Sequence, residues 1–247
     1  MAVYSQTALS IAIDTLEVAG FADTISIDGT VDVKEVTTFG SGGYRAHAVT
    51  LASANVSAEG FSDMATTGTD VSLPVTGFGA SRVLTVSVPG TTAADPAFMT
   101  QGPGNTLTPW GGSIGEMARF KLGFVSNGKL VRGSLLHPNA ARTASGSGTA
   151  VAFTTPTSTQ SLFASFHLLA VAGAGTCTFT VQTDDNPGFS SATTRITSTA
   201  FAAIGSQMTS LAGALAGETH VRVSWAISGF TSCTFIVAAG VAATSTL

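Results

Sequence analysis

Ser113 lies in a sequence pattern that could present a serine nucleophile. Residues 111–115 have the sequence Gly-Gly-Ser-Ile-Gly, and Asp184 and His220 follow in the chain order of an α/β-hydrolase triad. Such a nucleophile elbow needs a strand that delivers the serine to a sharp turn, followed by a long helix. Here Pro109 stands where that strand should be, and the segment after the pattern alternates like another strand. We therefore expect a glycine-rich loop, no catalytic residues and no enzyme.

The residue types that bind metal ions are present but lack the spacing of ligands. Four histidines are spread along the chain without the pattern of a metal site: His47, His137, His167 and His220. Residues 184–188, Asp-Asp-Asn-Pro-Gly, are acidic enough to suggest calcium, but the alternating acidic ligands and distal glutamate of a helical calcium loop are absent. The sequence favours a Pro-Gly turn there. We expect neither a metal nor another cofactor.

The elements that would position any site are short alternating segments, typical of β-strands. The clearest covers residues 221–228, and its pattern resumes at 233–237 after a turn centred on Gly229, which predicts an antiparallel pair. Residues 162–171 are apolar on both faces, as in a central buried strand. Asp28-Gly29 has the chemistry of a hairpin turn between two further short strands.

Helical signals are weak. Ser113 and Glu116 fit a capping box for at most a single turn. Residues 200–216 are rich in alanine but interrupted by glycines, so a helix and an irregular crossover remain alternatives. Loops rich in Gly, Pro and Thr are expected over 90–112 and 140–161. The sequence thus predicts an all-β protein, an antiparallel β-sandwich or barrel with long loops and little helix.

The length of 247 residues suits one large β domain or two small ones. We expect a single domain over residues 1–247, with a division into 1–125 and 126–247 as the alternative organisation.

The chain is poor in charge. Hydrophobic residues make up 44% and charged residues 10% of the sequence, against roughly 25% charged residues in an average soluble protein. Such a surface is unusual for a free monomer, and burial against neighbouring molecules would explain it. The net charge is −4 and the basic residues do not cluster, which argues against a protein that grips nucleic acid. A mildly acidic surface would let a polyanion pass without sticking.

The cysteines are expected to be reduced core residues. Residues 1–10 lack the charged start and apolar core of a secretory signal, and no apolar run is long enough to span a membrane. A disulfide between Cys177 and Cys233 is therefore not favoured. Both cysteines begin a Cys-Thr-Phe-x-Val segment whose apolar residues alternate onto one strand face.

Several stretches resemble siphophage tail tube (major tail) proteins. Residues 35–45, with the sequence EVTTFGSGGYR, resemble the segment that ends the first long strand of that family, and residues 53–61, SANVSAEGF, resemble the strand that returns along the sheet. Further similar stretches are 128–133, 162–167, 181–185 and 222–229, so the resemblance covers most of the chain. Glu35 is a departure, because the family often has Asp at that point.

The resemblance implies a β-sandwich of the phage tail tube type that closes with its own copies into a ring, as a hexamer or as a trimeric pseudo-hexamer. Stacked rings would form the conduit for DNA ejection, through whose lumen DNA passes without specific binding. Strands that close into a barrel across subunits remove exposed sheet edges, and head-to-tail stacking extends without closing. The implied location is the virion tail, assembled in the host cytoplasm, with other tail proteins as partners and no membrane.

A glycine-rich turn at residues 39–45 is the candidate inter-subunit contact. It carries Phe39, Tyr44 and Arg45, and aromatic and arginine side chains are frequent interface anchors. The alternative is that Phe39 and Tyr44 fold back onto the core of their own subunit.

Two other functions fit the composition. One is another virion structural role, as a capsid decoration or baseplate-associated protein. The other is a carbohydrate-binding β-sandwich, in which Trp110, Trp225 and Tyr44 would be the stacking residues. Because Trp225 belongs to a strand pattern that faces the core, Trp110 is the candidate for an exposed platform.

Overall fold

The structure, a computed structural model, describes residues 9–37, 42, 44–45, 47–63, 72, 79–215 and 217–243. Within these ranges the chain forms fourteen β-strands, and every ladder between them is antiparallel. The strands are β1 (Ser10–Ile13), β2 (Leu16–Glu17), β3 (Ala22–Glu35), β4 (His47–Phe61), β5 (Ser81–Ser87), β6 (Pro96–Gly111), β7 (Arg119–Val125), β8 (Val131–Arg142), β9 (Gly146–Ser147), β10 (Val151–Ala152), β11 (Gln160–Asp184), β12 (Thr193–Thr197), β13 (Gly205–Ala212) and β14 (His220–Ala243). The predicted all-β, antiparallel fold class is confirmed.

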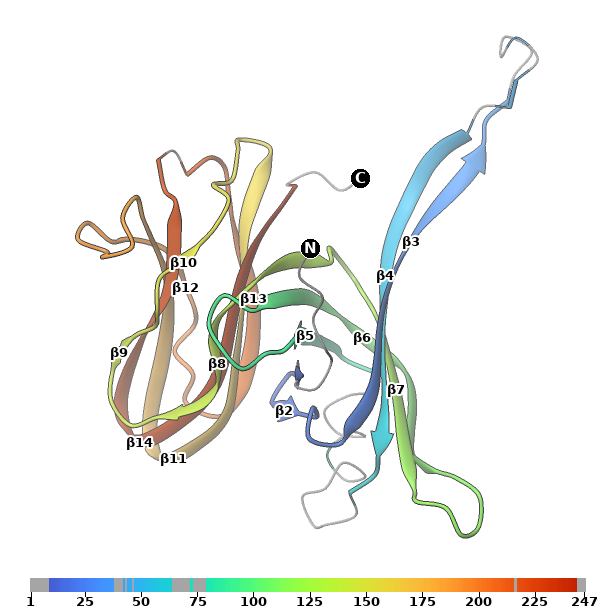
Figure 1. Cartoon of the computed structure of the whole chain (residues 1–247), viewed down its shortest axis with the longest axis horizontal. Coiled ribbons are helices and arrows are strands. Elements are labelled where there is room, and N and C mark those ends of the chain that lie inside the picture. The colour runs from blue at the N-terminus through green and yellow to red at the C-terminus, as the bar shows by residue number, and fades with distance from the viewer. Residues whose placement is uncertain are drawn as a thin grey trace.

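Strands β3, β4 and β7 and the second half of β6 form a four-stranded sheet, which we call the arm sheet (Figure 1). Strand β6 belongs to two sheets, because residues 97–103 pair with β5 whereas residues 104–111 pair with β7. The strand changes sheets after Pro103, and at the adjacent Gly102 a Cβ atom would lie 1.9 Å from the Val125 carbonyl oxygen. Only glycine allows so close an approach of two backbones.

Strands β11 and β14 form the other part of the molecule, a β-sandwich. They pair over their whole length, from Gln160 with Ala243 to Asp184 with His220. Both strands bend midway, where the register shifts between Leu168 and Thr176 of β11 and Gly229 of β14 has a positive φ of 82°. Each strand therefore contributes to both layers of the sandwich. Phe166 and Phe179, from the two halves of β11, accordingly stack with ring centroids 5.8 Å apart.

This bend corrects one prediction. Residues 221–228 and 233–237 are both strand, as predicted, but they are two halves of β14 and do not pair with each other. Gly229 makes a bend and not a hairpin turn, because each half finds its partner on β11.

The buried apolar side chains form three cores, one in each part and a third that joins β1, β6, β8 and β14 through Ala12, Ala97, Met99, Val131, Leu135, Ile236 and Ala238. The sandwich core lies between the two halves of the β11–β14 pair and contains Leu162, Phe166, Leu168, Cys177, Phe179, Val181, Val221, Val223, Trp225, Cys233, Phe235 and Val237. The arm sheet packs on β1 and β5 through Ile11, Ile13, Val56, Ala58, Leu84, Val86, Phe120, Leu122 and Phe124. Complete burial of a side chain of this size stabilises the fold by roughly 1.5–3 kcal/mol. The prediction of two buried cysteines in one core is confirmed, since Cys177 and Cys233 are both 0% exposed and free of any disulfide.

Three further predictions about elements differ from the structure. Asp28 and Gly29 lie inside β3, where they pair with β4, because the hairpin closes further along the chain. Most of the loop predicted over 90–112 is strand β6. Residues 200–216 contain strand β13, which pairs with β11, in place of a helix or an irregular crossover. The single turn at Ser113 is present, with the Glu116 N–H donating to the Ser113 carbonyl oxygen at 3.1 Å.

Candidate assembly surfaces

The residues of the hydrolase pattern do not form a triad. Ser113 lies in the connection between the antiparallel strands β6 and β7, with no strand-to-helix elbow. Asp184 and His220 are opposite each other on β11 and β14, in the sandwich and not in the arm sheet. The geometry therefore offers no route from Ser113 to a general base.

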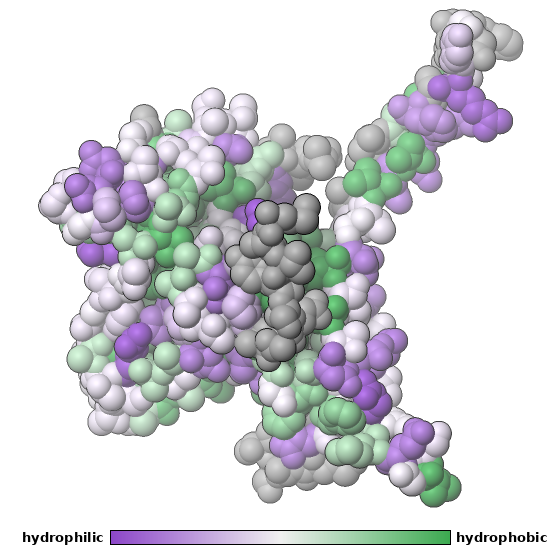
Figure 2. Space-filling model, in the orientation of Figure 1, coloured by the Kyte–Doolittle hydropathy of each residue, from purple (hydrophilic) through white to green (hydrophobic). Residues whose placement is uncertain are grey.

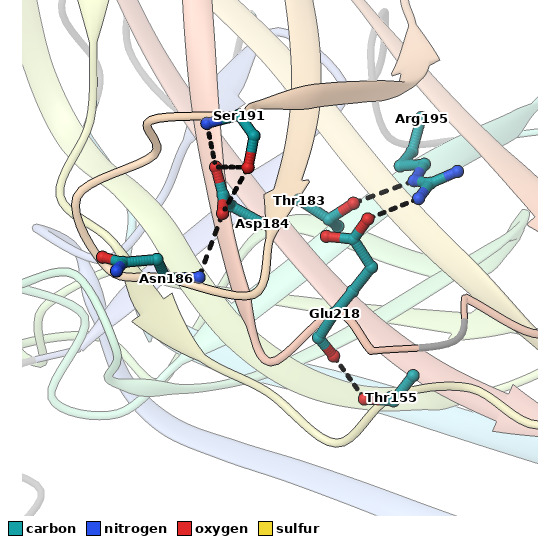
Figure 3. A network of polar contacts seen from close by, with 7 residues as sticks. All are labelled: Thr155, Thr183, Asp184, Asn186, Ser191, Arg195 and Glu218. Atoms are coloured by element: carbon teal, nitrogen blue, oxygen red, sulfur yellow. Dashed lines mark hydrogen bonds and ion pairs between the residues drawn. The ribbon is translucent and has the colours of Figure 1, made fainter.

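Asp184 instead stabilises the loop that follows β11 (Figure 3). Its carboxylate accepts hydrogen bonds from the backbone N–H groups of Asn186 at 3.0 Å and Ser191 at 2.9 Å. Close by, the Arg195 guanidinium donates to Thr183 Oγ1 at 2.9 Å and forms a 2.6 Å ion pair with Glu218. Residues 184–188 are thus a turn held by its own side chain, as predicted. Among the described residues, no cluster of three or more His, Cys, Asp or Glu side chains is arranged to hold a metal ion.

The most prominent surface feature is a two-stranded hairpin, which we call the arm. It consists of the parts of β3 and β4 that extend beyond β7, residues 29–35 and 47–54, together with the chain that connects them. Its two strands project away from the body (Figure 1). Every residue from Asp28 to Thr37 is exposed, so the ribbon has no buried face along this length of β3. Val31, Val33 and Val36 are 46%, 55% and 49% exposed. A two-stranded ribbon of this kind is marginally stable alone in water.

The end of the arm carries part of the predicted inter-subunit contact. Tyr44 is 81% exposed, so it does not fold back onto the core. Arg45 is also exposed, and its guanidinium lies 3.8 Å from the Glu35 carboxylate. An exposed ion pair at this distance contributes little to stability, so both groups remain available to a partner. Phe39 lies outside the described residues.

Among the strands that the structure describes, the arm sheet has an unpaired edge on each side. Strand β3 pairs with β4 alone in the described part of the chain. On the opposite side, residues 105–111 of β6 form a ladder with β7 alone among the described strands. The neighbouring Gly104 carbonyl accepts one hydrogen bond from Gly79 N–H, and the Pro109 carbonyl accepts one from Ser62 Oγ at 2.9 Å. Exposed edges of this length are templates for pairing with another chain.

The face of the arm sheet that points away from the core is polar and nearly neutral. Over the part of the sheet that packs on the core, its polar side chains are Thr24, Ser26, Asp28, Asn55, Ser57, Glu59, Thr106, Thr108, Arg119 and Lys121, and one aromatic ring, Phe61, lies beside Arg119. Lys121 lies 2.6 Å from Glu59, and Arg119 lies 2.7 Å from Asp23. Since each of these cations is paired with a carboxylate of its own chain, the face has little attraction for phosphate.

A second projecting hairpin carries exposed apolar side chains. Residues 109–118, which we call the tip loop, connect β6 to β7. Trp110, Ile114 and Met117 are 64%, 108% and 70% exposed. Large apolar side chains that gather on one exposed loop commonly mark an interaction site.

The aromatic residues proposed for carbohydrate stacking do not form a platform. Trp225 is only 7% exposed, and its indole N–H donates to the Ala144 carbonyl at 2.9 Å inside the sandwich. Trp110 and Tyr44 are exposed but belong to different hairpins.

A buried polar network joins the first part of the chain to the sandwich. His167 of β11 is fully buried, and its ring nitrogens lie 2.8 Å from Thr85 Oγ1 and 2.8 Å from the Asp14 carbonyl oxygen. Burial lowers the pKa of His167 from 6.5 to about 4, against the opposing effect of Asp14. The Asp14 carboxylate also binds Arg82 at 2.7 Å and accepts a hydrogen bond from Ser206.

The sequence matches no protein-family model and no curated protein. Among solved structures, the virion of a native gene transfer agent particle contains a chain with 21% identity and a TM-score of 0.39, covering 52% of this chain and 97% of that one. The tail of an empty gene transfer agent particle, refined with C6 symmetry, matches over the same shares at 22% identity and a TM-score of 0.37.

A third solved structure matches over nearly the whole chain. The Dit protein of phage SPP1, described as a hub of the adsorption apparatus, has 13% identity and a TM-score of 0.37, covering 96% of this chain and 100% of that one. All three identities are below 25% and all three TM-scores are below 0.5.

Sequence reasoning missed the tip loop and the free edges. Ile114 was assigned only to the hydrolase pattern, and Met117 to no site. The alternation in β3 and β6 indicates strands, but nothing in it reveals which strands lie at a sheet edge.

Proposed function

We propose that this chain is a structural subunit of a phage-type tail, which forms a ring with its own copies, and that the rings stack into a tail tube. The observation that supports this most is the arm sheet, an open four-stranded sheet with one unpaired edge on each side. The motifs at residues 35–45 and 53–61 that resemble tail tube proteins lie on β3 and β4 of this sheet and in the connection between them.

The direction of the strands is compatible with ring closure. Strand β6 is antiparallel to β7, β7 to β4, and β4 to β3. The β6 edge of one copy therefore meets the β3 edge of the next copy as a further antiparallel pair, and the order repeats around the ring. Leu107 of β6 and Ile27 of β3 both face the core side of the sheet, so their pairing would continue the apolar layer from copy to copy. Such a barrel has no free edges.

The polar face of the arm sheet would line the lumen. Because Arg119 and Lys121 are already paired with carboxylates, these two cations would attract a DNA molecule in transit only weakly. Serine, threonine and asparagine side chains would keep the lumen hydrated. DNA would pass through without specific binding.

The arm would contact a neighbouring copy through Phe39, Tyr44 and Arg45. The exposure of Tyr44 and Arg45 supports this role. The described chain contains one arm sheet, which favours a hexameric ring over a trimeric pseudo-hexamer. The partners are further copies of the chain and other tail proteins, the location is the virion tail after assembly in the host cytoplasm, and the role requires no enzymatic activity. In the part of the chain that the structure describes, no helix is long and apolar enough to cross a membrane.

A charge-swap experiment tests the ring. Ser26 of β3 and Thr108 of β6 would lie near each other across the junction between copies. Two lysines there, in Ser26→Lys with Thr108→Lys, should abolish rings in negative-stain microscopy and native mass measurement, because like charges on paired strands repel. Ser26→Asp with Thr108→Lys should restore them. Rings that survive the double lysine, in a protein whose melting temperature is unchanged, would refute closure through these edges.

A second candidate function is a single, baseplate-associated ring. The feature that favours it is the β11–β14 sandwich, which has its own core beside the arm sheet and which a plain conduit does not require. Microscopy of the assembled wild-type protein separates the two functions, since a tail tube gives stacks of constant width and a baseplate ring gives isolated rings.

We further propose that residues 1–247 fold as one domain and not as independent parts 1–125 and 126–247. Asp14 and Thr85 of the first part are hydrogen-bonded to His167 of the second. One domain predicts a single cooperative unfolding transition with coincident probes in both parts. Two separate transitions would contradict it.

A further inference from the structure

The tip loop and the arm project from opposite ends of the arm sheet. Strand β4 pairs with β7 so that Asn55 lies opposite Val125 and Phe61 lies opposite Arg119. The tip loop therefore leaves the sheet where β4 ends, whereas the arm leaves it where β4 begins. Figure 1 shows the two hairpins pointing in opposite directions.

Both projections expose apolar surface that their own chain does not cover. Figure 2 shows apolar patches on the arm and at the opposite projecting end. On the arm the exposed residues include Val31 and Val33, and on the tip loop they are Trp110, Ile114 and Met117. An apolar surface at each end of one sheet is what a head-to-tail contact between identical copies requires.

We infer that the tip loop of one copy docks on the arm of the next copy along the tube. This rests on the proposed stacking of rings, in which each copy turns one end of its arm sheet toward the opposite end of a neighbour. Docking removes the tip-loop side chains and the arm valines from water together. It also gives the marginally stable ribbon of the arm a surface to lie on.

The charges on and beside the tip loop favour a second copy of the chain over a lipid surface as its binding partner. The tip loop carries one charged side chain, the exposed Glu116. The cations that follow it, Arg119 and Lys121, are held in ion pairs. An anionic bilayer attracts free Lys and Arg, not a carboxylate. The arm offers Glu116 an exposed cation, Lys34, next to Val33.

A cross-link between separately purified variants tests the contact. Ile114→Cys places a thiol on the tip loop and Val33→Cys places one on the arm. The native Cys177 and Cys233 are 0% exposed and should stay unreacted. Oxidation of the mixed variants with a mild thiol oxidant such as diamide should give a covalent dimer on a denaturing, non-reducing gel. Val33→Cys mixed with Ile204→Cys, an exposed position outside both hairpins, is the matched control and should give much less dimer.

A stacking assay separates this inference from the proposed function. In the triple variant Trp110→Ser, Ile114→Ser and Met117→Ser, rings should form as in wild type, and species larger than one ring should be lost in sedimentation and microscopy. Ile204→Ser should stack normally. If wild type forms no rings, the proposed function fails. If rings stack equally well in the triple variant, or if its only defect is lost binding to anionic phospholipid vesicles, the docking of tip loop on arm is refuted.

Discussion

Mild acid should weaken the fold through His167. This histidine is fully buried and hydrogen-bonded to Thr85 and to the Asp14 backbone. Its pKa is about 4 in the folded protein and 6.5 when exposed. Because the folded pKa lies below the unfolded one, the unfolded chain binds more protons between these values. The stabilisation is complete above pH 6.5 and is lost as the pH falls toward 4.

The size of the effect follows from the two pKa values. Lowering the pH from 7.5 to 5 should decrease the free energy of unfolding by about 2 kcal/mol, because His167 binds a proton more readily in the unfolded chain. Well below pH 4, the total decrease in the free energy of unfolding reaches a limit of roughly 3 kcal/mol. Burial also lowers the pKa of His137 to about 4, with a further contribution from the Arg142 charge. His137 should add a loss of the same sign.

The assay is chemical denaturation of wild type and His167→Gln at pH 7.5 and at pH 5. Glutamine keeps one donor and one acceptor but does not titrate. The variant should be less stable at pH 7.5 but should lose about 2 kcal/mol less than wild type between the two pH values. His47→Gln is the matched control, because His47 is exposed on the arm, and it should keep the pH dependence of wild type.

An equal pH dependence in wild type and His167→Gln would refute the reasoning. If the variant does not fold, an NMR titration of wild type still decides, since the His167 ring resonances should not shift between pH 8 and pH 5.5. A midpoint near pH 6.5 would show that the buried network does not disfavour the charged ring.

Three further predictions concern assembly and chemistry. Tyr44→Ala with Arg45→Ala should leave the free energy of unfolding, measured by thermal melting, unchanged within about 0.5 kcal/mol, since both side chains are exposed. The same variant should no longer polymerise in sedimentation experiments. Normal tubes would contradict the role of this loop. Cys177 and Cys233 should resist labelling in the native protein and react after unfolding, because both are buried and burial raises the pKa of both thiols, that of Cys177 to about 12; rapid native labelling would count against the core assignment. Ser113→Ala should leave any esterase activity of the preparation unchanged, and a loss would reopen the hydrolase interpretation.

The sequence predicted strands well and their partners poorly. Alternation identified residues 221–228 and the core positions of Cys177 and Cys233, because a strand with one buried face has a period of two. It did not predict that β14 continues through Gly229, because the same glycine suits a hairpin turn and a bend. Asp28-Gly29 was wrongly expected to turn for a similar reason, since pairing with β4 overrides a local turn preference.

The candidate site was predictable only in part. Exposed aromatic and arginine residues beside glycines pointed to Tyr44 and Arg45, and the structure places both at the end of the arm. The free edges and the opposed directions of the two hairpins depend on which strands are neighbours. That information lies in contacts between distant residues, which a local pattern does not contain.

The pairing of β11 with β14 also bears on how the chain is made. Gln160 at the start of β11 has its partner, Ala243, about eighty residues later in the chain. At a synthesis rate of roughly 5–20 residues per second, β11 must wait several seconds on the ribosome before its partner emerges. The strands of the arm sheet have all been made by then, but their contacts with the sandwich, such as Thr85 with His167, must also wait for β11 to find its partner. In a chain that folds as one domain, the exposed strands of the first half would therefore stay without their final packing until synthesis has passed β14.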